Sequence, residues 1–185
     1  KEKRKSAVLD CNESGSTIRF LLPVAAVLGT NTEFTGGGRL PERPLSPLRE
    51  QMEAHGVVFS PINVFPVKIN GKMISGEFTI KGNISSQFIT GLLFALPLLN
   101  GNSIINVIPP VESRPYIDMT LNTLKKFGIT VTEKGNSFFI PGGQKYASPG
   151  TVESEGDWSN SAFFLTAGAV SGKVTVTGLD VSSVQ

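Results

Sequence analysis

The hexapeptide GNISSQ at residues 82–87 stands directly before the run FITGLLFAL at residues 88–96, which is apolar on nearly every side. Ser and Asn before such a run are typical N-cap residues, because their side-chain oxygens accept hydrogen bonds from amides left free in the first helical turn. The helix macrodipole adds partial positive charge at the same end, which favours an anion there. This stretch therefore predicts a buried helix whose N-terminus faces an anion pocket.

A period of about 72 residues organises the rest of the chain. Glycines that end predicted helices recur at Gly29, Gly101 and Gly172, and a second set recurs at Gly56 and Gly128. A regular internal period marks a tandem supersecondary unit, here strand–helix–strand–helix–strand–strand. The chain contains two full units and half of a third.

Hydrophobic periodicity and turn residues predict the elements of each unit. Helices are expected over residues 18–28, 45–55, 85–99, 114–127 and 161–170. Strands are expected over residues 7–10, 32–35, 57–59, 64–69, 77–80, 104–108, 129–132, 138–140 and 173–176. Pro23 is expected to kink the first of these helices.

The burial pattern predicts an α/β (α+β) fold with helices inside and sheets outside. The first helix of each unit is apolar all round and so belongs in the interior. The strands alternate polar and apolar residues, as in residues 173–177, so each sheet should keep one face in water. Both patterns are satisfied when the apolar helices lie parallel about a pseudo-threefold axis, an inside-out barrel. The helix N-termini, with their anion pockets, would then meet at one end.

Composition excludes several classes of protein. A formal net charge of +2 is too small to predict a nucleic-acid partner. One histidine and one cysteine cannot form a zinc site of the usual kind. The longest apolar run, residues 88–99, is too short to cross a bilayer and is interrupted by Pro97, so no membrane partner is expected. The lone Cys11 fits a reducing compartment, and we expect a cytoplasmic location.

The chain begins at Lys1 without a methionine and stops at Gln185, just after a strand-like segment. We therefore expect it to be a fragment of a longer protein. With a repeat missing, apolar surface of the central helices would be left uncovered, which is a liability. We expect the trailing half unit, residues 152–177, or a second chain to cover that surface.

The start of the central helix supplies the first candidates for an anion site. Ser85 and Ser86 could hold a phosphate through hydroxyls and first-turn amides, while the Gln87 amide reaches a second group. A well-capped core helix that binds nothing has the same pattern. The turn at Gly15 is similar, because glycine allows close backbone approach but is common in turns.

Arg43 and Arg114 each precede a proline at equivalent positions of the repeat. Either guanidinium could clamp a carboxylate or phosphate, although an arginine in this position is commonly just exposed. Ser113 and Tyr116 could donate to the same anion, or be an ordinary turn serine and a packed tyrosine. The residues alone therefore predict an anion-binding repeat protein and name no reaction.

Five motifs in order resemble the enolpyruvyl transferase family. They are ESGSTIR (13–19), RLPERP (39–44), ISSQF (84–88), SRPYID (113–118) and EGDWS (155–159), and they cover essentially the whole chain. The resemblance implies two domains, each of three such repeats wrapped about buried helices. It also implies transfer of the enolpyruvyl group of phosphoenolpyruvate to the 5-hydroxyl of shikimate 3-phosphate, with release of phosphate and without a metal or other cofactor.

The resemblance further implies roles for individual residues. Shikimate 3-phosphate is expected to contact, chiefly through its phosphate, Ser85, Ser86, Gln87, Ser113 and Tyr116. Phosphoenolpyruvate is expected to contact the Gly15 backbone amide, Arg43 and Gln87. Preorganised donors of this kind suit a reaction between two polyanions, in which positioning and charge neutralisation dominate.

The family's first repeat and nearly all of its other domain have no counterpart here. Residues 1–153 resemble two repeats of the first domain, and residues 154–185 resemble the hinge and opening of the second. The missing parts carry the family's acid and base carboxylates, so we expect no catalytic residue in this segment, which alone should be inactive. Glu13 and Ser16 depart from many members and Phe20 departs from some, which leaves the response to glyphosate, an inhibitor that targets this family, undetermined.

Two other functions fit the same pattern. The sister transferase that acts on UDP-N-acetylglucosamine shares the fold, but it carries a reactive cysteine in a mobile loop, whereas Cys11 precedes the first apolar helix. The other alternative is a non-catalytic anion-binding or assembly module built on the repeat.

Overall fold

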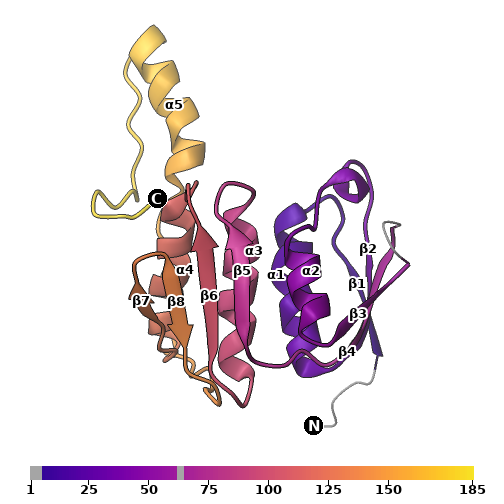
Figure 1. Cartoon of the computed structure of the whole chain (residues 1–185). Coiled ribbons are helices and arrows are strands. Elements are labelled where there is room, and N and C mark those ends of the chain that lie inside the picture. Colours follow the sequence, from indigo (N-terminus) through magenta and orange to yellow (C-terminus); the bar gives the residue numbers. More distant parts are fainter. Residues whose placement is uncertain (1–5, 62–64) are drawn as a thin grey trace.

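The structure is a computed structural model of the 185-residue chain and describes residues 6–61 and 65–185. Two four-stranded sheets flank the central helices, and one further helix stands apart (Figure 1). The helices are α1 (Gly15–Leu28), α2 (Leu48–Ala54), α3 (Ser86–Ala95), α4 (Arg114–Lys126) and α5 (Trp158–Ser171), with 3-10 turns η1 (Leu40–Glu42) and η2 (Leu96–Leu98). The strands are β1 (Ser6–Asp10), β2 (Asn31–Thr35), β3 (Val57–Ser60), β4 (Val67–Gly71), β5 (Glu77–Lys81), β6 (Ser103–Ile108), β7 (Thr132–Lys134) and β8 (Ser137–Ile140).

The two sheets share one topology, which confirms the predicted repeat. Their strand orders are β1-β2-β4-β3 and β5-β6-β8-β7. In each sheet the first two strands pair in parallel and the others pair antiparallel. Parallel neighbours need a long crossover, and α1 and α3 supply it between β1 and β2 and between β5 and β6.

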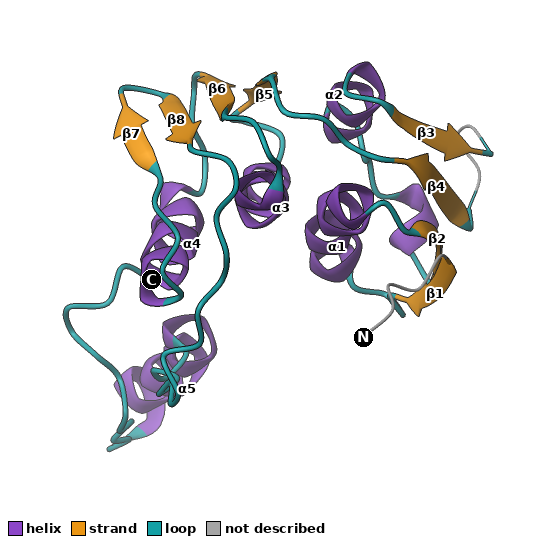
Figure 2. Ribbon diagram, turned by 90° about the horizontal axis from the view of Figure 1, so that it is seen from below, coloured by secondary structure: helices purple, strands orange, loops and turns teal. Residues whose placement is uncertain are grey.

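The two apolar helices α1 and α3 lie side by side between the sheets, as predicted (Figure 2). Their contact is close, because a Cβ added to Gly91 would overlap the backbone oxygen of Arg19. The rings of Phe20 and Phe94 meet edge-on across the pair, with centroids 5.7 Å apart. Despite this apolar character, none of the helices among the described residues combines the length and hydropathy needed to cross a bilayer.

Three helices begin at a polar N-cap residue, and the cap of α3 lies within the predicted stretch, residues 82–87. Ser14 accepts a hydrogen bond from the amide of Thr17 at 3.1 Å, and Ser85 accepts one from the amide of Gln87 at 3.3 Å. Asp157 caps α5 in the same way. Each side chain satisfies an amide that lacks a partner within its own helix.

A proline explains where one helix differs from the prediction. The α-helical part of α3 ends at Ala95 and not at residue 99, because Pro97 has no amide hydrogen to continue the helical ladder. Residues Leu96–Leu98 form η2 instead. Pro23 lies within α1, which continues through it as one helix.

Three strand predictions need correction or qualification. The strand expected at 129–132 starts later, as β7, because its pairing with β8 begins at Thr132. The strand expected at 64–69 is β4, which begins at Val67, and residue 64 lies outside the described residues. Residues 173–176 form no strand, because no described strand pairs with them.

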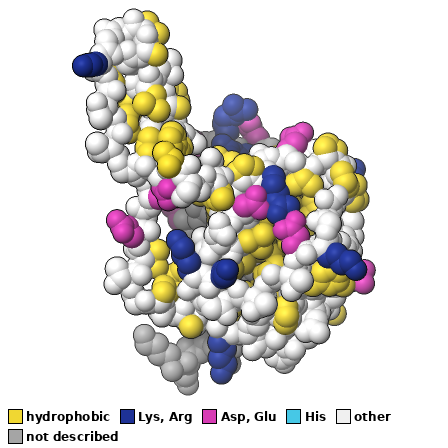
Figure 3. Space-filling view, turned by 90° about the vertical axis from the view of Figure 1, so that its left-hand side faces the viewer, with side chains coloured by type: hydrophobic (Ala, Val, Ile, Leu, Met, Phe, Trp, Pro, Cys, Tyr) yellow, Lys and Arg dark blue, Asp and Glu magenta, His cyan; other side chains and the backbone are white. Residues whose placement is uncertain are grey.

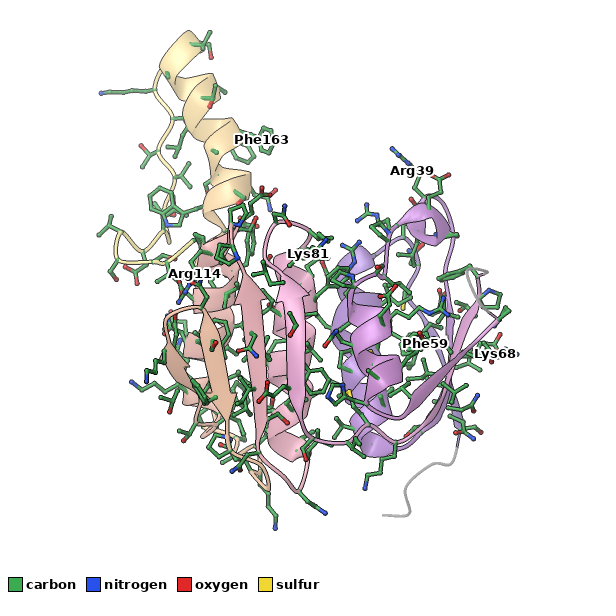
Figure 4. All side chains as sticks on the ribbon, in the orientation of Figure 1. Arg39, Phe59, Lys68, Lys81, Arg114 and Phe163 are labelled. Atoms are coloured by element: carbon green, nitrogen blue, oxygen red, sulfur yellow. The ribbon has the colours of Figure 1, made fainter. Side chains whose placement is uncertain are left out.

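Helix α5 is the main departure from the predicted architecture. Only Ser161 of this helix is buried, whereas Phe163 and Phe164 are 76% and 63% exposed. Hydrophobic side chains gather on this protruding segment in Figure 3, and Phe163 projects from α5 beyond the ends of both sheets in Figure 4. The prediction that the trailing half unit covers the central helices is therefore wrong, because its own apolar side chains face solvent.

Candidate anion-binding site

Helices α1 and α3 begin at the same end of the body, where β1 and β5 finish (Figure 1). Their N-caps, Ser14 and Ser85, hold equivalent positions in the two repeats. First-turn amides and the positive ends of two helix dipoles therefore face a shared region, which favours negative charge. Lys81 and Arg114 lie at this end as well (Figure 4).

A groove of about 630 Å³ runs between α1, α3 and α4 from this end. Its polar lining includes all the residues expected at shikimate 3-phosphate, namely Ser85, Ser86, Gln87, Ser113 and Tyr116. Phe20, Phe94 and Met119 add an apolar wall. These candidates come from the starts of α3 and α4, which η2 and β6 separate in sequence, and α1 of the other repeat closes the groove with Ser16, Arg19 and Phe20.

Several hydroxyls in the groove have no hydrogen-bond partner among the described residues. Across residues 6–61 and 65–185, no side chain or backbone group hydrogen-bonds the hydroxyl of Ser86, Ser113 or Tyr116. Ser113 also has a left-handed backbone, with φ of 55°, which is uncommon for a residue other than glycine. These hydroxyls are available to a ligand that accepts or donates hydrogen bonds.

The residues expected at phosphoenolpyruvate, Gly15 and Arg43, lie against one another. Gly15 is the buried first residue of α1, and a Cβ added to it would lie 2.8 Å from Nη1 of Arg43. The guanidinium of Arg43 has no hydrogen bond or carboxylate partner in the part of the chain that the structure describes. An unoccupied guanidinium beside a helix N-terminus can bind a carboxylate or phosphate.

Arg114, at the equivalent sequence position of the next repeat, is engaged differently. Its Nε donates to Asp118 Oδ1 at 2.7 Å, and its two terminal nitrogens donate to the two carboxylate oxygens of Glu133, each at 2.7 Å. These hydrogen bonds raise the pKa of Arg114 and lower the pKa of Glu133. Because two carboxylates neutralise this guanidinium, the structure favours a structural arginine over an anion clamp.

Arg19 is the residue that the sequence analysis did not single out. It is only 8% exposed, and it donates from Nη1 to Gln87 Oε1 at 2.8 Å and from Nη2 to the Pro44 carbonyl at 2.9 Å. It borders both the groove and a second cavity of about 280 Å³ beside Arg43. Burial, and then the neighbouring charge of Arg43, lower the pKa of Arg19. A lone arginine inside an apolar helix was the available signal, since arginine is rarely buried without a partner.

Cys11 does not resemble a nucleophile. The side chain is 2% exposed at the end of β1, and burial, followed by the charge of Asp10, raises the pKa of its thiol. Only the thiolate is strongly nucleophilic, so a raised pKa works against reactivity. Among residues 6–61 and 65–185, no three His, Cys, Asp or Glu side chains are grouped to hold a metal ion.

Comparison with known proteins identifies a family. A family model described as EPSP synthase (3-phosphoshikimate 1-carboxyvinyltransferase) matches residues 1–185. A relative named 3-phosphoshikimate 1-carboxyvinyltransferase from Clostridium acetobutylicum is 44% identical over 98% of this chain, and one from Brachyspira hyodysenteriae is 42% identical over 100%. The chain spans 43% and 44% of the length of these relatives. A solved structure of EPSP synthase from Acinetobacter baumannii shares the fold, with a TM-score of 0.75 at 21% identity, covering 95% of this chain and 40% of that one.

Proposed function

The chain belongs to the EPSP synthase family, and from that premise we propose that it is part of an enzyme that joins phosphoenolpyruvate to shikimate 3-phosphate. The enolpyruvyl group would pass to the 5-hydroxyl of shikimate 3-phosphate, and phosphate would leave. Because the chain spans less than half the length of the relatives above, we assign this activity to a longer polypeptide and expect the segment alone to be inactive. The supporting observation is the groove, which joins two helix N-termini, unpaired hydroxyls and the Arg19 guanidinium.

In this proposal the shikimate 3-phosphate subsite lies at the start of α3. Ser85, Ser86 and Ser113 would hold the phosphate, and Tyr116 would line the pocket beside it. The unpaired hydroxyls of Ser86 and Ser113 support this role. Hydrogen bonds to an anionic oxygen are roughly twice as strong as neutral ones, so a phosphate is a suitable occupant.

The phosphoenolpyruvate subsite would lie beside the first turn of α1. The Gly15 amide and the Arg43 guanidinium would bind this anion, and Gln87 would reach both substrates from between the two subsites. The contact between Gly15 and Arg43 and the absence of a carboxylate partner for Arg43 in the described residues support this assignment. These groups would position two polyanions and neutralise their charge, while acid and base groups would come from outside this segment.

Two further assignments belong to the proposal. Residues 1–153 would be two repeats of the first domain, and residues 154–185 would open a second domain, which suits the position of α5 outside the two-sheet body. We also propose that the protein works in the cytoplasm, because a single buried cysteine suits a reducing compartment.

A polypeptide that continues this chain to the length of its relatives tests the proposal. We expect it to release phosphate only when both substrates are present, and we expect Arg43→Met to abolish most of that activity while the surface variant Arg39→Met retains it. Calorimetry should detect binding of shikimate 3-phosphate and no binding of UDP-N-acetylglucosamine. Binding of the second compound instead would favour the sister transferase, and binding of neither would favour a non-catalytic module.

A further inference from the structure

Arg19 carries a buried positive charge that no negative charge in the described part of the chain matches. No carboxylate within residues 6–61 and 65–185 pairs with its guanidinium, and the buried Nε has no hydrogen-bond partner there. Burying a charge or a polar group without partners is costly, so such a group in a native fold points to a constraint other than stability. The ring of Phe88, 5.0 Å from the Arg19 Cζ atom, offsets only part of this cost.

The contacts of Arg19 determine which way the Gln87 amide faces. A guanidinium has donors only, so the Gln87 atom that meets Nη1 at 2.8 Å must be the carbonyl oxygen. The amide nitrogen of Gln87 is then turned to the other side, where it donates to Ser16 Oγ at 2.7 Å. An amide nitrogen carries two hydrogens, so one donor remains for a ligand in the groove that Gln87 lines.

The other terminal nitrogen of the Arg19 guanidinium contacts the loop that carries Arg43. Nη2 of Arg19 donates to the carbonyl of Pro44, the residue directly after Arg43. One planar group therefore spans the start of α3 and the loop before α2. Because the guanidinium is rigid, a shift of Gln87 would be transmitted to Pro44, and a shift of Pro44 to Gln87.

We propose that Arg19 is a positioning residue that locks the Gln87 amide and the Pro44 backbone as one unit, so that Gln87 presents its N–H donor to an anion in the groove and Arg43 its guanidinium to an anion in the adjacent cavity. The identity of those anions rests on the proposed function, whereas the locking geometry does not. Lysine could not replace Arg19, because a single ammonium lacks the fork that reaches two acceptors on opposite sides.

The first test observes the lock itself in the intact protein. With glutamine side chains labelled with nitrogen-15, and the Gln87 signal assigned by its loss in Gln87→Asn, we expect Arg19→Lys to shift that signal and to speed its hydrogen exchange about ten-fold or more. Gln144, whose side-chain amide donates to the carbonyls of Thr130 and Pro141, is the internal control and should not change. An unchanged Gln87 signal in a folded Arg19→Lys protein would overturn the proposal.

The second test measures the consequence for binding. We expect Arg19→Lys to raise the KM for both substrates about five-fold or more while the melting temperature stays close to that of the wild type, and Arg39→Lys to change neither KM. Gln87→Ala should weaken binding much less in the Arg19→Lys background than in the wild type, because the locked geometry is already lost. If Arg19→Lys and Gln87→Ala weakened binding independently, so that their effects multiplied in the double variant, the proposal would be overturned. If the wild-type protein turned over neither substrate, the proposed function would be refuted. The hydrogen-exchange test would still decide whether Arg19 locks Gln87.

Discussion

The guanidinium of Arg43 lies over the first residue of α1 so closely that a Cβ on Gly15 would be 2.8 Å from Nη1 and 3.2 Å from Cδ. Glycine at this position therefore allows the side chain of Arg43, from a different part of the chain, to approach closely. Its φ is not in the left-handed region, so backbone strain is not the reason for glycine here. The relationship places the Arg43 guanidinium against the first turn of α1, where the phosphoenolpyruvate subsite is proposed.

Gly15→Ala should displace Arg43 without unfolding the protein, because the atoms in conflict belong to a flexible side chain. We expect the KM for phosphoenolpyruvate to rise about ten-fold, with a smaller change for shikimate 3-phosphate. Steady-state kinetics on the intact protein measure both values. Gly37→Ala is the matched control, since a Cβ there meets nothing within 4 Å. Equal effects of the two variants would contradict this explanation.

Arg114→Met should act on stability and leave the groove largely intact. Its loss leaves Glu133 and Asp118 without their shared partner, and we expect a decrease of about 1 kcal/mol in the free energy of unfolding, because partial exposure screens these pairs. Denaturant titration of the intact protein measures it. Arg43→Met, which removes no such pair from the described residues, should cost less stability and far more activity. The reverse ranking would show that the two arginines have been assigned the wrong roles.

The same cluster predicts a pH dependence. Hydrogen bonds from Arg114 hold the pKa of Glu133 below its ordinary value of 4.5. A carboxyl whose folded pKa is depressed stabilises the fold above its unfolded pKa, and this stabilisation is lost as pH falls through the folded pKa. Below pH 4.5, the wild type should therefore lose stability more steeply than Glu133→Gln. Unfolding curves measured at several pH values test this, and parallel losses in the two proteins would refute it.

A buried pair of hydroxyls, from Thr90 and Thr120 in the lining of the groove, joins α3 to α4. Thr120 donates to the Tyr116 carbonyl at 2.8 Å, so it accepts at its 2.9 Å contact with Thr90, which donates. Thr90→Val and Thr120→Val should each destabilise the protein by about 1–2 kcal/mol, and the double variant by less than the sum, because the pair is broken only once. Denaturant titrations of the four proteins complete the cycle. Strict additivity would mean that the contact contributes nothing.

The crossing of α1 and α3 depends on Gly91. A Cβ there would overlap the Arg19 backbone, and backbone cannot move aside as a side chain can. We expect Gly91→Ala to destabilise the protein by about 3 kcal/mol, with Gly37→Ala again as the neutral control. A loss below about 1 kcal/mol, measured by denaturant titration, would show that the helices can separate at little cost.

Local chemistry in the sequence was sufficient to predict the repeat, the caps and the interior helices. Ser14 and Ser85 are N-caps because a hydroxyl satisfies nearby amides whatever the rest of the fold does. The apolar faces of α1 and α3 require burial wherever they find a partner. The predicted strand, the polar cap and the apolar run were enough to locate the candidate site residues at the start of α3, just after β5.

Only the tertiary structure decided which candidates act together. Gln87 and Ser16 are hydrogen-bonded although 71 residues separate them, and Arg19 reaches Gln87 across 68. No local pattern distinguishes Arg43, which the structure leaves without a partner in the described residues, from Arg114, which Glu133 and Asp118 neutralise. Burial likewise depends on which elements pack together. For this reason the phenylalanines of α5 are exposed to solvent, although α5 is as apolar in sequence as α1 and α3.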